Sequence, residues 1–233
     1  MKLSIIIPVF NEKKTIKTII KKVVAIKRIK KEIIIVDDYS TDGTREILKN
    51  IHYREVKKIL LHNRNIGKGG AIKTARKYLD GDIVIIQDAD LEYNPKDYHK
   101  LLRPFEKAKT QVVYGSRVLK KKRYKLGKGF WINFRVFANF ALTQFSNFLN
   151  KQNLTDAHTC YKLFTVKLFK KIKLNENDFA FCPEITTKIS NKGINIKEVP
   201  ISYKGRNYSE GKKINILDAF RAVYVILKYK IRK

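Results

Sequence analysis

The chain has 233 residues, and its hydrophobic content of 44% is too high for a disordered protein and sufficient for a substantial core. Its 51 Lys and Arg residues against 21 Asp and Glu residues give a net charge of +30, which favours an anionic partner: a nucleic acid, an anionic lipid surface or a phosphorylated substrate. No stretch of 18 or more apolar residues is present to span a bilayer, and the first apolar run is too short for a signal peptide. Cys160 and Cys182 lack metal-ligand spacing and fit a reduced, cytoplasmic protein better than a disulfide framework.

Strands and helices alternate through the first half of the chain. Apolar runs predict strands over residues 3–9, 32–36, 56–61, 83–86 and 111–114. Apolar residues at helical spacing predict helices over residues 13–26 and 43–49, and two more that begin near Lys68 and Pro95. Short connections with this rhythm indicate right-handed βαβ units, and so an α/β fold with a mainly parallel sheet flanked by helices.

The second half is less regular. Residues 119–128 hold six Lys and Arg residues and no acid, which predicts a cationic loop. Residues 130–149 form a long apolar helix pattern, interpreted as a core helix with a lipid contact as the alternative. A helix over residues 183–192, closed by Gly193, precedes a strand over residues 194–203.

The last predicted helix, residues 215–233, carries one apolar stripe. The stripe consists of Leu217, Phe220, Tyr224, Leu227 and Ile231, and basic residues lie off it. Such a helix can lie in a membrane interface or pack on its own domain, and the pattern fits both. We predict a catalytic domain over residues 1–211, followed by a basic amphipathic helix over residues 212–233.

Acidic residues gather where three predicted strands end. Glu12 follows the first strand, Asp37 and Asp38 follow the second, and Asp88 and Asp90 follow the fourth. Because parallel strands share their carboxyl edge, these side chains are expected to converge there. Crowded carboxylates repel one another and raise their pKa values, so a bound cation explains this cluster better than a contribution to stability.

Asp88 and Asp90, with Glu92 two residues further on, predict an all-oxygen site for Mg²⁺ or Mn²⁺ that holds a diphosphate. The alternative is that they are ordinary turn residues. Asp38 is placed to accept hydrogen bonds from a base or ribose. The glycine-rich segment 65–70 opens a helix and would suit a phosphate, but it lacks P-loop spacing, and a close turn is the alternative.

In this order and spacing the segments resemble family 2 glycosyltransferases with the GT-A (Rossmann-like) fold. The matching segments are SIIIPVFNE at 4–12, IVDDYSTDGT at 35–44, NIGKG at 65–69 and DADL at 88–91. Residues 114–117, 154–156, 159–164, 183–186 and 203–214 resemble the polyprenyl-phosphate or dolichyl-phosphate hexosyltransferase branch, which includes dolichyl-phosphate mannose synthases. The resemblance covers nearly the whole chain.

The resemblance implies a role for each matching residue. It implies nucleoside contacts at Pro8, Phe10, Glu12, Val36 and Asp38, and donor contacts at Asp88, Ala89 and Asp90, of which Asp88 and Asp90 also hold the metal. Glu92 stands where a further metal or donor contact is expected. Arg117, Arg206 and Lys212 match positions that grip the acceptor phosphate and the departing diphosphate. Phe10 replaces a frequent tyrosine and Glu92 a frequent glutamine. His158 and Cys160 lie in a segment that varies between subgroups, so the identity of the sugar stays open.

We therefore predict an inverting, metal-dependent glycosyltransferase that transfers a hexose from a nucleotide sugar to a polyprenyl phosphate. The favoured donor is UDP-glucose, with GDP-mannose as the alternative, and the expected location is peripheral, on an anionic membrane at its cytoplasmic face. A lipid phosphate is already ionised and needs no strong base to attack. The cationic loop at 120–128 is expected to close over that phosphate.

Two other functions compete with this prediction. Transfer to a glycan hydroxyl in cell-envelope polysaccharide synthesis would need a carboxylate base, and Asp156 and Glu184 are candidates, although a structural role is preferred for each. A basic nucleic-acid-binding protein would need no divalent ion, and its affinity would fall steeply with salt. No nucleic-acid motif supports it, so no nucleic acid is expected as a partner. The oligomeric state is left open.

Overall fold

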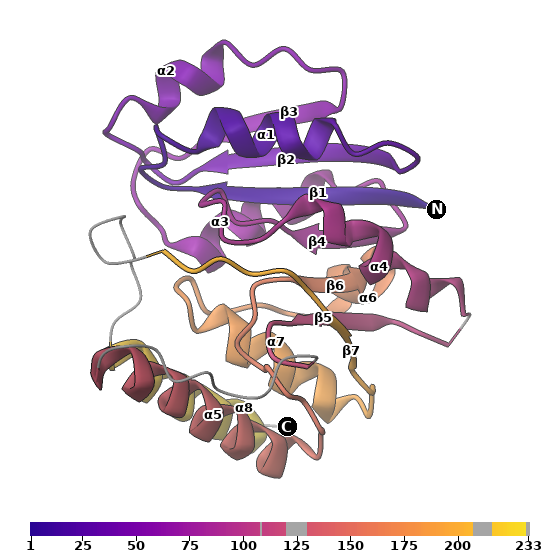
Figure 1. Ribbon diagram of the computed structural model, residues 1–233, viewed down its shortest axis with the longest axis vertical. Coiled ribbons are helices and arrows are strands. Elements are labelled where there is room, and N and C mark those ends of the chain that lie inside the picture. Colours follow the sequence, from indigo (N-terminus) through magenta and orange to yellow (C-terminus); the bar gives the residue numbers. More distant parts are fainter. Residues whose placement is uncertain (108, 120–129, 207–215, 232–233) are drawn as a thin grey trace.

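A seven-stranded sheet forms the centre of the computed structural model, which describes the chain except residues 108, 120–129, 207–215 and 232–233 (Figure 1). The strands are β1 (Lys2–Val9), β2 (Lys30–Asp37), β3 (Val56–Leu61), β4 (Ile83–Ile86), β5 (Val112–Ser116), β6 (Lys162–Thr165) and β7 (Lys197–Pro200). Their order is β3-β2-β1-β4-β6-β5-β7. β6 runs antiparallel to both of its neighbours, and the other pairs are parallel. The predicted mainly parallel α/β sheet is thus confirmed.

Helices cover both faces of the sheet. α1 (Ile16–Val24), α2 (Thr44–Lys49) and α4 (Tyr98–Leu102) contribute to the core on one face, and α3 (Lys68–Ala75), α6 (Val166–Lys171) and α7 (Phe181–Asn191) to the core on the other. In β1, Ile5 and Ile7 enter the first core while Ile6 enters the second. Because side chains of a strand alternate between faces, a sheet covered on both sides requires such continuous apolar runs.

The pattern of the sequence does not predict β6 and α6. β6 has only four residues and begins with the fully buried Lys162, whose Nζ donates to the carbonyl of Ala157 at 2.7 Å. Because a charged residue stands at the first position of β6, the apolar pattern does not indicate a buried strand there. The helix predicted at Pro95 is instead a succession of η2 (Pro95–Asp97), α4 and η3 (Arg103–Glu106), with η1 (Arg76–Tyr78) extending α3.

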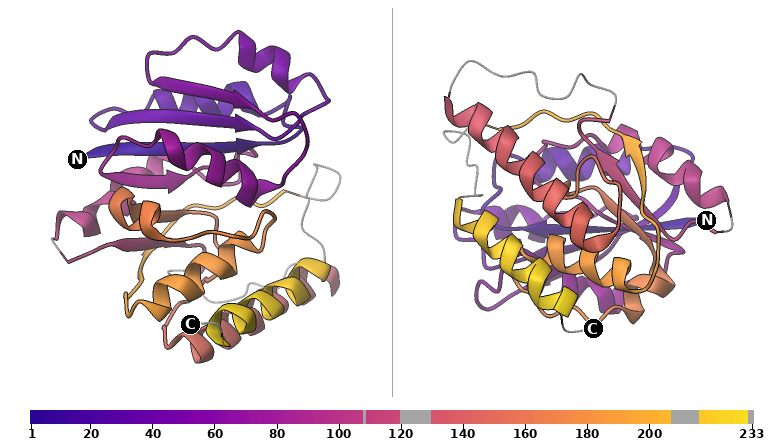
Figure 2. Two further views of the ribbon diagram at one scale, coloured as in Figure 1. Left: turned by 180° about the vertical axis from the view of Figure 1, so that it is seen from behind. Right: turned by 90° about the horizontal axis from the view of Figure 1, so that it is seen from below.

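α5 (Phe130–Asn150) lies beside α8 (Ile216–Ile231) at one end of the molecule, and α8 also contacts α7 (Figure 2). The fully buried side chains of the described part of α5 are polar, namely Thr143, Ser146 and Asn150, whereas Phe137 and Phe148 are exposed. The described part of α5 therefore departs from the predicted apolar core helix: its buried side chains are polar, apolar side chains such as Leu142 and Phe145 are half-buried, and Phe137 and Phe148 face solvent.

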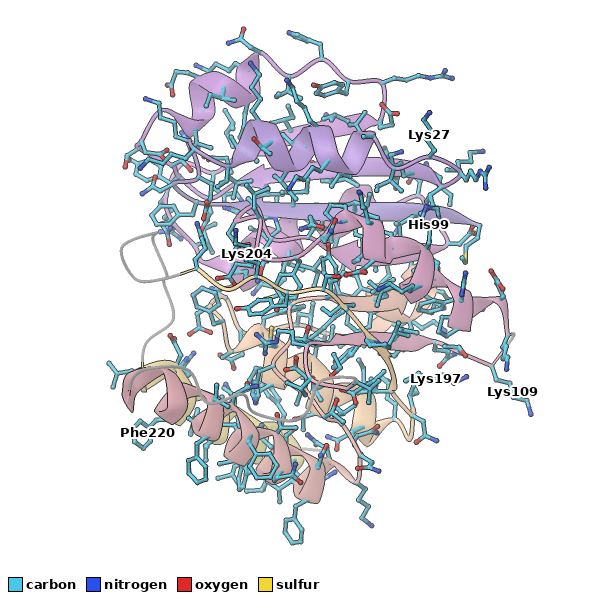
Figure 3. The ribbon with its side chains drawn as sticks, in the orientation of Figure 1. Lys27, His99, Lys109, Lys197, Lys204 and Phe220 are labelled. Carbon is cyan, nitrogen blue, oxygen red and sulfur yellow. The ribbon has the colours of Figure 1, made fainter. Side chains whose placement is uncertain are left out.

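α8 has two apolar faces. Ala222, Val225, Ile226 and Tyr229 are buried against the domain. The predicted apolar stripe lies on the other face, where exposure ranges from 39% at Leu227 to 80% at Ile231. Figure 3 shows Phe220 of this stripe projecting away from the sheet. The helix thus packs on its own domain and still leaves the stripe uncovered. Among the described residues, no helix is both long and apolar enough to cross a bilayer.

Candidate active site

The acidic segments after β1 and β4 meet at Arg206. The guanidinium donates to both carboxylate oxygens of Glu12, each at 3.1 Å, and its Nη2 lies 3.4 Å from Asp90 Oδ2. The segments start side by side because the backbone N–H of Gln87 donates to the carbonyl of Ile6 at 2.9 Å. The structure thus brings together three residues that the sequence places at the site, two from strand ends and one from residues 201–206, here called the Arg206 segment.

Asp88 and Asp90 lie on the loop that follows β4. Asp88 Oδ1 is 2.5 Å from the Nζ of Lys68, while Asp90 Oδ1 accepts the backbone N–H of Glu92 at 3.1 Å. Burial, together with the negative charges of Asp88 and Glu92, raises the pKa of Asp90 to about 7. The loop therefore holds more negative charge than its neighbours neutralise.

This excess of negative charge fits a divalent cation, which favours carboxylate oxygens. Within the described ranges, no group of three or more His, Cys, Asp or Glu side chains is arranged to hold a metal ion. Asp88 and Asp90 would therefore supply two ligands, and water or donor phosphate would complete the coordination, as is usual for Mg²⁺.

Glu92 is engaged within the protein. Its carboxylate accepts the hydroxyl of Tyr203 at 2.8 Å and the backbone N–H of Arg206 at 2.7 Å, and its carbonyl accepts the N–H of Lys204 at 2.9 Å. The sequence predicts Glu92 as a third metal ligand. In the structure both of its carboxylate oxygens fasten the Arg206 segment to the loop after β4.

The acids after β2 form a separate cluster. Asp38 is buried, and its carboxylate accepts the N–H groups of Ile66 and Gly67 at 2.9 and 2.7 Å and contacts Nδ1 of His62 at 2.8 Å. Asp37 pairs with Arg45 at 2.7 Å. Asp38 thus holds the glycine-rich turn through Ile66 and Gly67, as the close-turn alternative for residues 65–70 expects, whereas Asp37 is bonded to Arg45 and to the backbone N–H of Ser40.

Arg117 and Asp156 form a buried pair. The guanidinium donates from Nε and Nη2 at 2.7 and 2.8 Å, and the backbone N–H of Arg117 adds a third bond at 3.0 Å. Burial alone would raise the pKa of Asp156, but Arg117 more than offsets this and lowers it. Asp156 is therefore structural. Glu184, the other candidate base, is also structural: it accepts the N–H groups of Asn175 and Glu176.

The remaining predicted site residues are described by their burial and their place on the strands. Pro8 and Val36 are buried opposite each other on β1 and β2, Ala89 is buried in the core, and Phe10 is partly buried just after β1. Lys212 and the cationic loop at 120–128 lie outside the described residues.

Three residues near the site are missed by the sequence reasoning. Lys68 opens α3, His62 follows β3 and holds Asp38, and Tyr203 holds Glu92. A signal exists for His62, because the argument that gathers side chains at strand ends applies equally to β3. Lys68 and Tyr203 approach the site from segments whose direction depends on tertiary packing.

The profile of the family described as "Glycosyl transferase family 2" matches residues 4–173 of this chain. The chain belongs to glycosyl transferase family 2. It is thus a nucleotide-sugar glycosyltransferase of the hexosyltransferase type, and the resemblance seen in the sequence is confirmed.

Two curated members of the family match over almost all of this chain. The UDP-N-acetylglucosamine–dolichyl-phosphate N-acetylglucosaminyltransferase of Methanococcus voltae is 28% identical over 247 residues, which cover 98% of this chain and 96% of that protein. A dolichyl-phosphate beta-glucosyltransferase of Trichomonas vaginalis is 26% identical over 248 residues, with coverages of 98% and 73%.

The fold also matches a solved structure. Glucosyl-3-phosphoglycerate synthase from Mycobacterium tuberculosis, in complex with Mn²⁺, uridine diphosphate and phosphoglyceric acid, superposes with a TM-score of 0.71 at 16% identity. The match covers 98% of this chain and 78% of the synthase. The predicted GT-A fold is therefore confirmed.

Proposed function

We propose that the protein is an inverting, metal-dependent glycosyltransferase that moves a hexose from a nucleotide sugar, with UDP-glucose favoured and GDP-mannose the alternative, to a polyprenyl phosphate. The observation that carries the proposal is the contact between Asp90 on the β4 loop and Arg206 on the Arg206 segment. A single site thereby offers carboxylates for a cation and a guanidinium for an anion. The dolichyl-phosphate acceptors named for two relatives support a lipid phosphate.

Asp88 and Asp90 would hold Mg²⁺ or Mn²⁺, which neutralises the charge that grows on the departing diphosphate. Arg206 would bind phosphate oxygen through its guanidinium. Its Nε is buried and has no hydrogen-bond partner among the described residues, so the protein leaves one donor of the guanidinium unused. In the proposed displacement an acceptor phosphate oxygen attacks the anomeric carbon, the nucleoside diphosphate leaves, and the configuration inverts.

The charges around the site favour a phosphate over a hydroxyl acceptor. In the described part of the chain, Asp88 meets Lys68, Glu12 meets Arg206 and Glu92 meets Tyr203. A hydroxyl acceptor needs a base, whereas an ionised phosphate attacks without one. Arg117 and Lys212 stay in the proposal as acceptor contacts, Arg117 through the part of its guanidinium that Asp156 leaves free.

Radiolabelled UDP-glucose and GDP-mannose, each with a short polyprenyl phosphate and Mn²⁺, test this function. We expect label from one donor to become extractable into chloroform, and chelation of the metal to stop it. Label that moves only into water-soluble glycan would favour the hydroxyl acceptor. Product formed at an undiminished rate in excess chelator would contradict metal dependence.

The bonds to Glu92 lead to a prediction for Tyr203. Tyr203→Phe retains the ring, which lies 5.3 Å from the ring of Tyr93, and removes the hydroxyl that donates to Glu92. Loss of a hydrogen bond to a charged group should loosen the Arg206 segment and lower kcat/KM about tenfold. Tyr78→Phe, the same change on the distant η1, serves as control. Unchanged kcat/KM in Tyr203→Phe would show that the bond from the Tyr203 hydroxyl to Glu92 does not help to position Arg206.

We also propose that the uncovered apolar stripe of α8, with Phe137 and Phe148 of the adjacent α5, rests in the interface of an anionic membrane. These are exposed apolar side chains on two adjacent helices of a chain with a net charge of +30. Apolar rings enter the boundary between head groups and acyl chains, while Lys and Arg attract the anionic lipids. This arrangement would bring the site close to a lipid-borne acceptor.

Phe220→Glu tests the membrane contact. Replacing an exposed ring by a carboxylate removes apolar area and adds repulsion from the lipids, so binding to anionic vesicles should fall about tenfold. Vesicle flotation measures it, with Leu61→Glu on the exposed edge of β3 as a matched control. Equal losses in both variants would reflect net charge alone and would contradict a contact through the stripe.

A further inference from the structure

Lys68 brings a positive charge onto one of the two proposed metal ligands. It is the first residue of α3, its side chain is 12% exposed, and its Nζ lies 2.5 Å from Asp88 Oδ1. The same Nζ is 3.4 Å from the Sγ of Cys160 and 5.8 Å from the centre of the Phe179 ring. Burial would lower the pKa of Lys68, but Asp88 more than offsets this and the pKa is raised, so the ammonium stays charged.

The backbone fixes the position of Lys68. Gly67 has a φ of +98°, and a Cβ at Gly67 would lie only 2.5 Å from the carbonyl oxygen of Asn177. The N–H of Gly67 donates to Asp38, and the N–H of Gly70 donates to that same carbonyl of Asn177. The start of α3 is thus clamped between two parts of the chain, and the buried pair with Asp88 belongs to the fold.

We propose that Lys68 is an intramolecular counterion, which occupies Asp88 in the free enzyme and competes there with the divalent cation. The inference rests on the proposed metal site at Asp88 and Asp90. An ammonium and a divalent cation that share one carboxylate oxygen repel each other strongly at such distances. Cation binding must therefore displace or weaken the contact of Lys68, and the free enzyme should bind the metal more weakly than its carboxylates alone would.

Titration of the nucleotide-free protein with Mn²⁺, followed by the electron paramagnetic resonance signal of the unbound ion, tests the competition. We expect Lys68→Met to bind Mn²⁺ about tenfold more tightly than the wild type, because the competing charge is gone. Lys68→Arg keeps the charge and should retain an affinity close to that of the wild type. Asp88→Asn should weaken binding in every background.

The outcomes distinguish a failure of the counterion role of Lys68 from a failure of the proposed metal site at Asp88 and Asp90. If Asp88→Asn abolishes binding while Lys68→Met and the wild type bind equally, the metal site stands and the counterion role is overturned. If Asp88→Asn binds Mn²⁺ as the wild type does, the proposed metal site itself fails.

A measurement on the wild type covers the case in which Lys68→Met does not fold. Lysine labelling with an amine-reactive reagent, read by mass spectrometry, should show Lys68 becoming at least about threefold more reactive on addition of Mn²⁺, because a displaced ammonium loses its carboxylate partner. Lys170, which donates to the carbonyl of Leu79 away from the site, is the internal control. Unchanged reactivity of Lys68 at saturating Mn²⁺ would overturn the inference.

Discussion

Replacing Asp90 by Asn is expected to lower the rate of hexose transfer by about 100- to 1000-fold. The amide keeps the size of the side chain but loses the charge that the proposed cation requires. The amide oxygen of the substituted side chain can still accept the backbone N–H of Glu92, as Asp90 does at 3.1 Å, so the fold should change little. Initial rates measured over a Mn²⁺ titration check the prediction, and additional metal should not restore the rate.

Asp82→Asn is the matched control. Asp82 immediately precedes β4, whereas Asp90 lies on the loop that follows β4, and the side chain of Asp82 is mostly exposed. Its transfer rate should stay close to that of the wild type. A rate for Asp90→Asn that is within a few fold of the wild type would remove Asp90 from the reaction. Circular dichroism of both variants separates a catalytic loss from a loss of structure.

Replacing Asp156 by Asn is expected to lower the free energy of unfolding by about 2 kcal/mol, because the change leaves the charge of Arg117, whose side chain is only 20% exposed, without its partner. Urea denaturation measures this as a lower midpoint with an unchanged slope. The double variant Arg117→Met with Asp156→Leu removes both charges and should unfold at a higher urea concentration than Asp156→Asn.

The same pair has a pH signature with a definite sign. Arg117 lowers the pKa of Asp156 in the folded protein, so the carboxylate stabilises the fold fully above its unfolded pKa of about 4. The difference in stability between the wild type and Asp156→Asn should therefore shrink as the pH falls below that value. Asp80→Asn, at an exposed ion pair with Lys57, should unfold nearly as the wild type at every pH. A constant difference across the acid range would contradict a charged Asp156.

The sequence predicts the central sheet well because its strands are buried on both faces. Near-continuous apolar runs such as Ile83–Ile86 then mark strands directly, and the acids that follow them mark one edge of a parallel sheet. The meeting of Glu12 and Asp90 follows from that geometry. Periodicity does not predict Arg206, the residue that joins Glu12 and Asp90. Its backbone N–H is bonded to Glu92, which lies 114 residues earlier in the chain, so the contact forms only in the folded protein.

Two other features show where periodicity ends. The charge of Lys162 hides β6, since its hydrogen bond to Ala157 exists only in the folded chain. The apolar stripe of α8 is located correctly, but α8 also carries a second apolar face, so the pattern does not say which one faces the domain. In the folded chain the face with Ala222, Val225, Ile226 and Tyr229 packs on the domain, where α8 contacts α5 and α7.

The proposed metal site at Asp88 and Asp90 is tested most directly by a crystal structure with UDP and Mn²⁺, in which anomalous scattering locates the ion. We predict one strong peak bonded to oxygens of Asp88 and Asp90 and to the diphosphate, with Nζ of Lys68 no longer within hydrogen-bond distance of Asp88, which it contacts at 2.5 Å in the free protein. Diphosphate bound at this edge of the sheet without a metal, or a metal held away from both aspartates, would contradict the account.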